Sequence, residues 1–147
     1  MESKICTKCG VEKKLSQFHK NGPRLRADCN KCNTARVKAR KFDKKKYLID
    51  KYQSMLQRVN GTHSSKRHQH IYVGLELMDR DEFIENSLND PEYNRLHDEW
   101  AASGYEHKLA PSTDRMDGDV GYVWDNIDWV THSVNSIDGA MRRNGLI

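Results

Sequence analysis

Oxygen-bearing side chains suited to a divalent cation lie near the C-terminus of this 147-residue chain. Asp114 falls in a run expected to be extended, and Asn135 falls in the first turns of a helix expected to run toward Arg143. A carboxylate leaving a strand and an amide oxygen on the following helix can converge on one point. Such ligands suit Mg²⁺, which keeps several waters and takes phosphate oxygens as its remaining ligands. The segment predicts a catalytic Mg²⁺ or Mn²⁺ site.

Local sequence signals predict the elements that position these groups. Residues 109–116 form an expected extended segment, and a Gly-rich loop over 117–121 lets the chain reverse. Residues 127–130 alternate apolar and polar side chains, as a half-buried strand does. Thr131 or Ser133 can cap the helix that follows. The expected order is strand, loop, strand, helix.

Residues 114–135 carry the pattern D-R-x-D-x-x-x-G-Y-x-x-D-N-I-x-W-V-T-x-x-x-N. This pattern resembles the core of the HNH endonucleases, the ββα-metal nucleases common among phage-encoded free-standing homing enzymes. The resemblance implies an α+β fold, with a ββα-metal core of the HNH or His-Me type and flanking helices. It also implies that Asp114 and Asn135 bind the metal, while Asn126 ties the loop to the first strand and orients the site.

One position departs from the pattern usual in that family. Most HNH sites follow the metal-binding Asp with a His that deprotonates the attacking water, whereas this chain has Arg115. Arginine stays protonated in proteins and cannot serve as a general base, but it suits a phosphate clamp. The candidates for the base are His132, His107 and Tyr122, and Tyr122 is also a candidate nucleophile. Their spacing does not decide among them.

All four cysteines of the chain form two Cys-x-x-Cys pairs near the N-terminus. Cys6 and Cys9 are separated from Cys29 and Cys32 by nineteen residues, which is zinc-ribbon spacing. Four thiolates predict a closed, structural Zn²⁺ site, and two disulfides are the alternative. The segment between the two pairs has too few large apolar residues to fold by burial alone. The bound metal would therefore supply the free energy of folding. The run 8–38 also resembles the four-cysteine finger at the front of phage HNH proteins.

Charge is distributed unevenly along the chain. Residues 1–70 hold 19 Lys and Arg against 5 Asp and Glu, a net of +14, whereas residues 71–147 hold 6 against 16, a net of −10. The basic half predicts binding to the phosphates of double-stranded DNA, with a solvated helix face or an acidic protein partner as alternatives. The candidate DNA-binding residues are Arg36, Lys38, Arg40, Lys41, Lys44, Lys45 and Lys46.

The middle of the chain predicts helices that pack against the C-terminal motif. One carries an apolar stripe over 48–59 and is expected to begin near Asn33 or Phe42. Asp79 opens a second helix through an acidic variant of the capping box, and Asp90-Pro91 opens a third.

These signals divide the chain into three expected parts. Residues 1–40 form a four-cysteine finger, residues 41–70 a basic helix and linker, and residues 71–147 a nuclease-like domain. Residues 62–70 are expected to be a polar linker, whose histidines are weaker candidates for metal or phosphate contacts. Residues 71–73 predict a strand.

The expected function is a metal-dependent DNA endonuclease, a phage-type HNH homing enzyme that hydrolyses phosphodiester bonds by nicking or double-strand cleavage. The alternatives are a zinc-finger DNA-binding regulator with a degenerate, inactive HNH fold and an RNA-directed or structural interaction protein. Mean hydropathy is −0.92, and no apolar stretch approaches the roughly 20 residues of a membrane span. The sequence therefore predicts no membrane partner, no small-molecule substrate, and a cytoplasmic location, in the host cell if the protein is phage-encoded.

Overall fold

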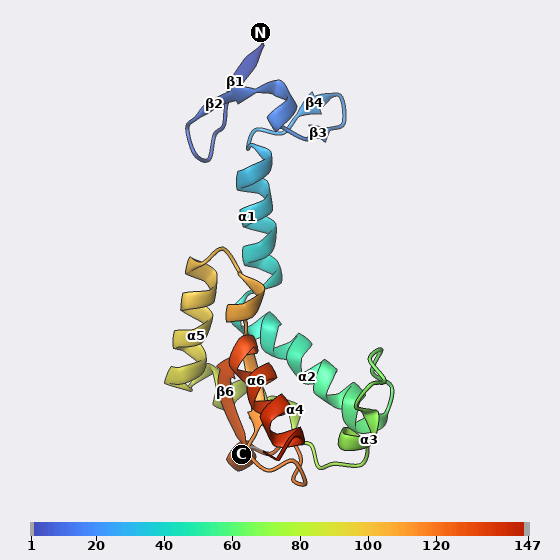
Figure 1. Ribbon diagram of the computed structural model, residues 1–147. Coiled ribbons are helices and arrows are strands. Elements are labelled where there is room, and N and C mark those ends of the chain that lie inside the picture. The colour runs from blue at the N-terminus through green and yellow to red at the C-terminus, as the bar shows by residue number, and fades with distance from the viewer. Residues whose placement is uncertain (1, 146–147) are drawn as a thin grey trace. The chain divides into compact units, whose positions relative to one another are not determined.

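The computed structural model describes residues 2–145 and has a mixed architecture of helices and small sheets (Figure 1). The chain divides into two compact units, Met1–Phe42 and Asp43–Ile147. Each sheet has two strands, so helices supply most of the regular structure. Within the described part of the chain, no helix combines the length and apolar character needed to cross a bilayer.

The first unit is built from two short hairpins and one helix. Strands β1 and β2 pair antiparallel, as do β3 and β4. Among the described residues, Phe18 is the one large apolar side chain buried beside Cys6 and Cys29, and Leu25 packs on this small cluster. The elements are β1 (Ser3–Ile5), β2 (Glu12–Lys14), η1 (Leu15–Gln17), β3 (Lys20–Asn21), β4 (Arg24–Leu25) and α1 (Asn30–Lys41).

The second unit surrounds one hairpin with helices. Its core includes Leu48, Met55, Phe83, Tyr93 and Trp129, which come from four different elements. The elements are α2 (Lys44–Asn60), α3 (Gln69–Tyr72), α4 (Arg80–Leu88), α5 (Pro91–Ala102), η2 (His107–Leu109), β5 (Pro111–Arg115), η3 (Trp124–Asn126), β6 (Ile127–Thr131) and α6 (His132–Arg143).

The helical region from residue 30 to residue 60 consists of two helices rather than one. The first ends at Lys41 with Phe42 as its C-cap, and Asp43 caps the second by accepting a hydrogen bond from the Lys46 backbone N–H at 3.4 Å. Gly61 ends α2 in the left-handed conformation, with φ of +74°. The predicted apolar stripe is confirmed as core packing, because Leu48 and Met55 are buried.

The two acid-capped helices are confirmed. Asp79 accepts hydrogen bonds from the backbone N–H groups of Asp81 and Glu82 at the start of α4. Asp90 accepts one from Glu92 at 2.8 Å, and Pro91 occupies the first turn of α5. Local capping chemistry is therefore enough to set where both helices begin.

The strand predicted at residues 71–73 is wrong, because Ile71 and Tyr72 lie in α3 and Val73 caps its C-terminus. The backbone N–H of Ile71 donates to the His68 carbonyl at 3.0 Å, and that of Val73 donates to Gln69 at 3.1 Å. Three apolar residues are too short a run to distinguish a strand from a turn of helix. Here the preceding turn, not a neighbouring strand, accepts the backbone hydrogen bonds.

The predicted hairpin near the C-terminus is confirmed as β5 paired antiparallel with β6. Asp114 lies opposite Asp128, and Arg115 lies opposite Ile127. Trp129 packs against Tyr93 with the two ring centroids 4.6 Å apart. Thr131 caps α6 by accepting from the Val134 backbone N–H at 3.2 Å, and α6 then packs on both strands.

Candidate functional site

The four cysteines gather into one group in the first unit. Cys6 and Cys9 lie in the turn after β1, Cys29 precedes α1, and Cys32 lies in its first turn. Their sulfur atoms all lie within 4.8 Å of one another, and all four are free thiols. A single group of four suits one tetrahedral ion better than two separate bridges. The cysteines are therefore positioned to hold a metal ion, consistent with structural zinc.

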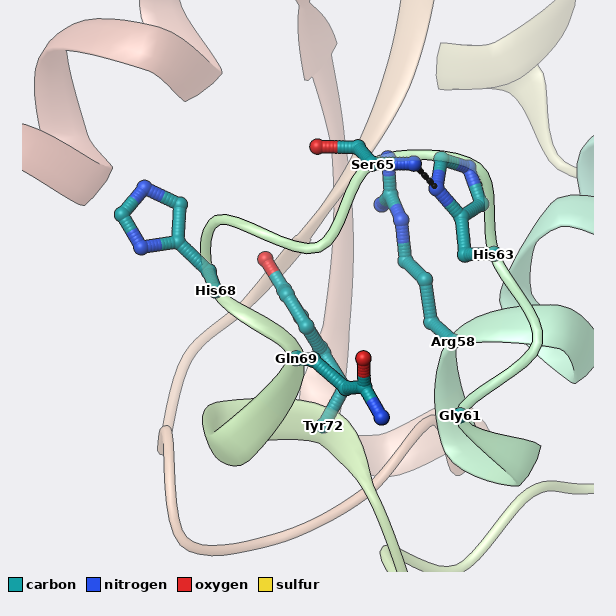
Figure 2. Close-up of a pocket in the computed structure, with 7 residues that line it drawn as sticks. All are labelled: Arg58, Gly61, His63, Ser65, His68, Gln69 and Tyr72. Carbon is teal, nitrogen blue, oxygen red and sulfur yellow. Dashed lines mark hydrogen bonds between the residues drawn. The ribbon is translucent and has the colours of Figure 1, made fainter.

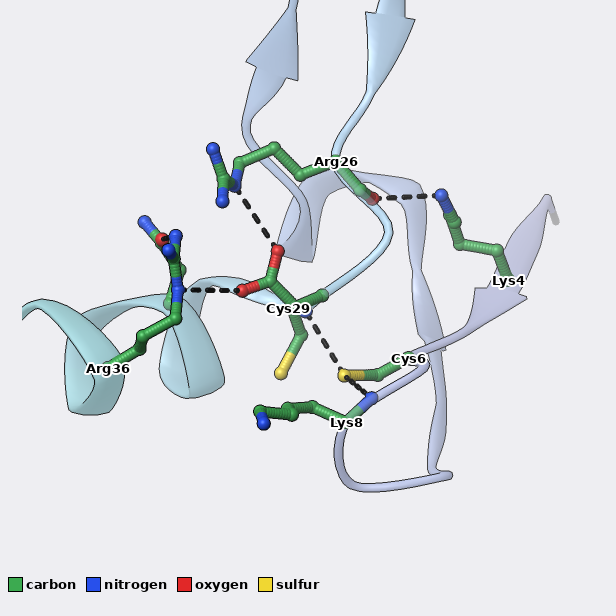
Figure 3. Close-up of polar contacts among 8 residues, drawn as sticks. Lys4, Cys6, Lys8, Arg26, Cys29 and Arg36 are labelled. Carbon is green, nitrogen blue, oxygen red and sulfur yellow. Dashed lines mark hydrogen bonds and ion pairs between the residues drawn. The ribbon is translucent and has the colours of Figure 1, made fainter.

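Backbone N–H groups around Cys6 favour the thiolate that a metal requires (Figure 3). The backbone N–H of Cys29 donates to the Cys6 Sγ atom at 3.2 Å, and that of Lys8 donates at 3.4 Å. Burial alone would raise the pKa of Cys6, but a backbone hydrogen bond from Cys9 at 3.5 Å, together with those from Cys29 and Lys8, outweighs it and lowers the pKa to about 6. A hydrogen bond from the Cys32 backbone N–H lowers the pKa of Cys29, and Lys13 Nζ, which donates to Cys29 Sγ at 3.1 Å, lowers it further.

A separate cleft of about 260 Å³ lies in the second unit. Asp114 from β5 and Asn135 from α6, twenty-one residues apart, both line it, together with Arg115 and Tyr122. Asp114 is only 6% exposed. A buried carboxylate and an amide at one cleft are ligand types that Mg²⁺ accepts, with waters and phosphate oxygens completing its shell.

Two asparagine side chains hold the backbone around this cleft. Asn126 accepts from the Asp117 backbone N–H at 2.9 Å and donates to the carbonyls of Asp117, Val120 and Gly121. It therefore fixes the conformation of the loop between β5 and β6. Asn135 donates through Nδ2 to Ser112 Oγ at 2.7 Å, which ties α6 to β5.

Arg115 is held by the same loop. Its Nη1 atom donates to the carbonyls of Gly118 at 2.6 Å and Val120 at 3.1 Å. The guanidinium carbon lies 4.9 Å from the ring centroid of Tyr72 and 5.4 Å from that of Tyr122. Two aromatic faces and two carbonyls orient a fixed positive charge at the edge of the cleft.

Of the three candidates for the general base, only Tyr122 lines the cleft. Tyr122 lines the cleft, but burial raises the pKa of its phenol despite the opposing charges of Arg58 and Arg115, which disfavours it as a base. His132 and His107 lie together, with ring centroids 4.4 Å apart. Neither lines the cleft, because the backbone of His132 pairs with Ala110, at the opposite end of β5 from Arg115.

No known family model, curated protein or solved structure matches this chain. Function is therefore inferred from the two sites themselves.

The predicted DNA-binding residues fall on both units. Arg36, Lys38, Arg40 and Lys41 lie on exposed positions of α1, whereas Lys44, Lys45 and Lys46 form the first turn of α2. Two of them have acidic partners: Arg36 lies 3.9 Å from Asp28, and Lys44 lies 3.0 Å from Asp98. The others present their charges to solvent, where a phosphate backbone has access to them.

Arg58 of α2 is a residue of the cleft that the sequence interpretation missed. It lies three residues after Met55, whose Sδ atom contacts Thr113 Oγ1 at 3.8 Å beneath β5. Helical spacing places positions three apart on one face. A basic residue three positions beyond a core-facing residue was the signal available for finding Arg58.

Proposed function

We propose that this protein is a Mg²⁺-dependent DNA endonuclease with an HNH-type, ββα-metal centre. One observation carries the proposal: a hairpin followed by a helix brings Asp114 and Asn135 to one cleft, beside the oriented guanidinium of Arg115. The residue types and their order along the chain agree with the resemblance described above. A phosphodiester is the substrate whose charge and reaction suit this set of groups.

The donor set fits magnesium. Asp114 supplies one carboxylate, and the hydrogen bond from Asn135 Nδ2 to Ser112 directs the amide oxygen of Asn135 away from that serine. Mg²⁺ is commonly held by one or two carboxylates, several waters and substrate phosphates. When bound, the ion would stabilise charge on the phosphate and lower the pKa of water.

The remaining residues of the cleft bind the phosphate and hold the loop around it in place. Arg115 presents its guanidinium to a phosphate oxygen and stabilises the charge that develops there. Asn126 keeps the loop carbonyls that hold Arg115 in place, because it and Arg115 share the Val120 carbonyl as an acceptor. The exposed basic side chains of α1 bind the DNA backbone, and zinc on the four cysteines stabilises the unit that carries them.

Cleavage of supercoiled DNA by the full-length, zinc-loaded protein tests the proposal. Wild-type protein should nick or cut with Mg²⁺ or Mn²⁺ and not without, and Asp114→Ala should lose cleavage while retaining DNA binding. Asp125→Ala removes an exposed acid from the same region and serves as the matched control. Cleavage by Asp114→Ala at the wild-type rate would refute the site.

A DNA-binding regulator with an inactive centre is the second candidate. It is favoured by Arg115 at the position of the usual base and by the lack of a histidine among the described residues that line the cleft. In that case wild-type protein binds DNA with a strong salt dependence but never cuts it with either metal.

A further inference from the structure

A smaller cavity of about 80 Å³ adjoins the Asp114 cleft (Figure 2). It is formed by the end of α2, the loop that follows, and α3. Arg58 and Tyr72 line both cavities, so the two are immediate neighbours. A single water needs only roughly 10–15 Å³ of such space, so the cavity has room for a group larger than one water.

Two histidines line this cavity, His63 and His68, and His63 is not arranged as a metal ligand. The Ser65 backbone N–H donates to Nδ1 of His63 at 3.0 Å, so Nδ1 is an acceptor. The proton of the neutral ring is then on Nε2, which lies 3.2 Å from Ser54 Oγ and donates to it. Both nitrogens of His63 are engaged. Among the described residues, no group of three metal-ligating side chains includes one from this cavity.

The lining is instead rich in hydrogen-bond donors and carries positive charge. Figure 2 shows Arg58 extending from α2 toward the loop, with Gln69 and the hydroxyl group of Tyr72 also present. The Arg58 guanidinium carbon lies 5.4 Å from the Tyr72 ring centroid, which fixes its orientation. None of the described residues lining this cavity is acidic. Such a lining favours an anion with several oxygens.

We propose that this cavity, bounded by Arg58, Ser65 and Gln69, binds a backbone phosphate of the DNA strand that enters the Asp114 cleft. The inference rests on the proposed function, because only a DNA-cleaving protein would bring a DNA strand into the Asp114 cleft. Successive phosphates of one strand lie roughly 3.4 Å apart along the helix axis, so a continuous strand can occupy two adjoining sites at once. Arg58, which lines both, sets the register of the strand relative to the cleft.

DNA binding measured without added divalent metal tests the inference separately from cleavage. Arg58→Gln should weaken binding of a short duplex about tenfold and reduce the salt slope by about one unit. Arg67→Gln removes the same charge from the loop between α2 and α3, at an exposed position that does not line the cavity, and should have a much smaller effect. Equal losses in the two variants would overturn the inference, because general electrostatics would then explain both.

Two further measurements guard against a folding defect. Gln69→Ala removes a donor without removing charge, so it should weaken binding a few-fold with an unchanged salt slope. Titration of wild-type protein with inorganic phosphate should shift the amide NMR signals of Ser65 and Gln69 to saturation, and Arg58→Gln should abolish the shifts. Absence of any shift in wild-type protein would overturn the inference, whether or not the protein cuts DNA.

Discussion

Asn135 donates its side-chain amide to Ser112 Oγ across 2.7 Å, joining the first turns of α6 to β5. Ser112 is buried, so this hydrogen bond is shielded from solvent and fixes which way the Asn135 amide faces. The same amide group also donates to the Thr113 carbonyl at 3.4 Å. The orientation of one proposed metal ligand therefore depends on its neighbours in β5.

Ser112→Ala should raise the Mg²⁺ concentration needed for half-maximal cleavage by roughly 10-fold or more, since the loss of a group that orients a metal ligand typically costs 10–100-fold in affinity or activity. Titration of the cleavage rate with Mg²⁺ measures this shift. Ser136→Ala changes an exposed serine on the same helix and should leave the midpoint where it is. An unchanged midpoint in Ser112→Ala would mean that Asn135 needs no support from β5.

Removal of zinc should unfold the first unit and spare the second. Within residues 2–42, Phe18 is the one large apolar side chain buried with the cysteines, so metal binding must supply most of the stabilisation; structural Zn²⁺ in finger peptides contributes about 10–16 kcal/mol. Elemental analysis should find one zinc per chain, and a chelator should collapse the amide NMR signals of residues 2–42 only. Preparations that retain a folded first unit without zinc would contradict the assignment.

Gly121→Ala should destabilise the second unit by about 1–3 kcal/mol or more. A Cβ atom at this position would lie 1.9 Å from the Glu76 carbonyl oxygen, which is backbone and cannot rotate away. The close approach is needed because the neighbouring Tyr122 backbone N–H donates to Glu76 at 2.8 Å. Gly118→Ala is the matched control, since no atom lies within 4 Å of its added Cβ. Denaturant unfolding should separate the two variants.

Acid should destabilise the second unit partly through His132. Burial lowers the pKa of this histidine, and the charges of His107 and Lys51 lower it further. The unfolded chain takes up the proton near the ordinary value of about 6.5, before the folded chain does, so the free energy of unfolding falls as pH drops below that value. His132→Gln should lose less stability between pH 7 and pH 5 than wild type, whereas the exposed His70→Gln should follow wild type. Parallel pH profiles for wild type and His132→Gln would exclude this contribution.

The elements that the sequence predicted correctly are those set by local chemistry. Asp79 and Asp90 each satisfy backbone N–H groups within three residues, so the start of each helix needs no distant partner. The hairpin was predictable because β6 alternates buried and exposed positions at its start. The grouping of the cysteines followed from spacing alone, because a Cys-x-x-Cys turn points two sulfurs the same way.

The features that the sequence did not reveal depend on tertiary packing. Arg58 reaches the cleft because α2 packs beneath β5; its helical spacing from Met55 indicates the face of α2 on which it lies, but not the strand that this face meets. His132 follows the proposed site closely in sequence, yet the strand register places it beside His107, away from the cleft. Of the two helix starts that the sequence left open, near Asn33 or Phe42, the structure has the one beside Phe42, and its local signal is Asp43 as a helix cap.

In the proposed function, the division of the chain between Phe42 and Asp43 would make DNA binding by the first unit act as a tether for the second. Once the first unit holds a duplex, the encounter of the second unit with the same duplex becomes intramolecular, at an effective concentration on the order of millimolar for a short linker. The Asp114 cleft would then need little affinity of its own for DNA. On this proposal, the position of the cut would follow from the reach of the tether as much as from contacts inside the cleft.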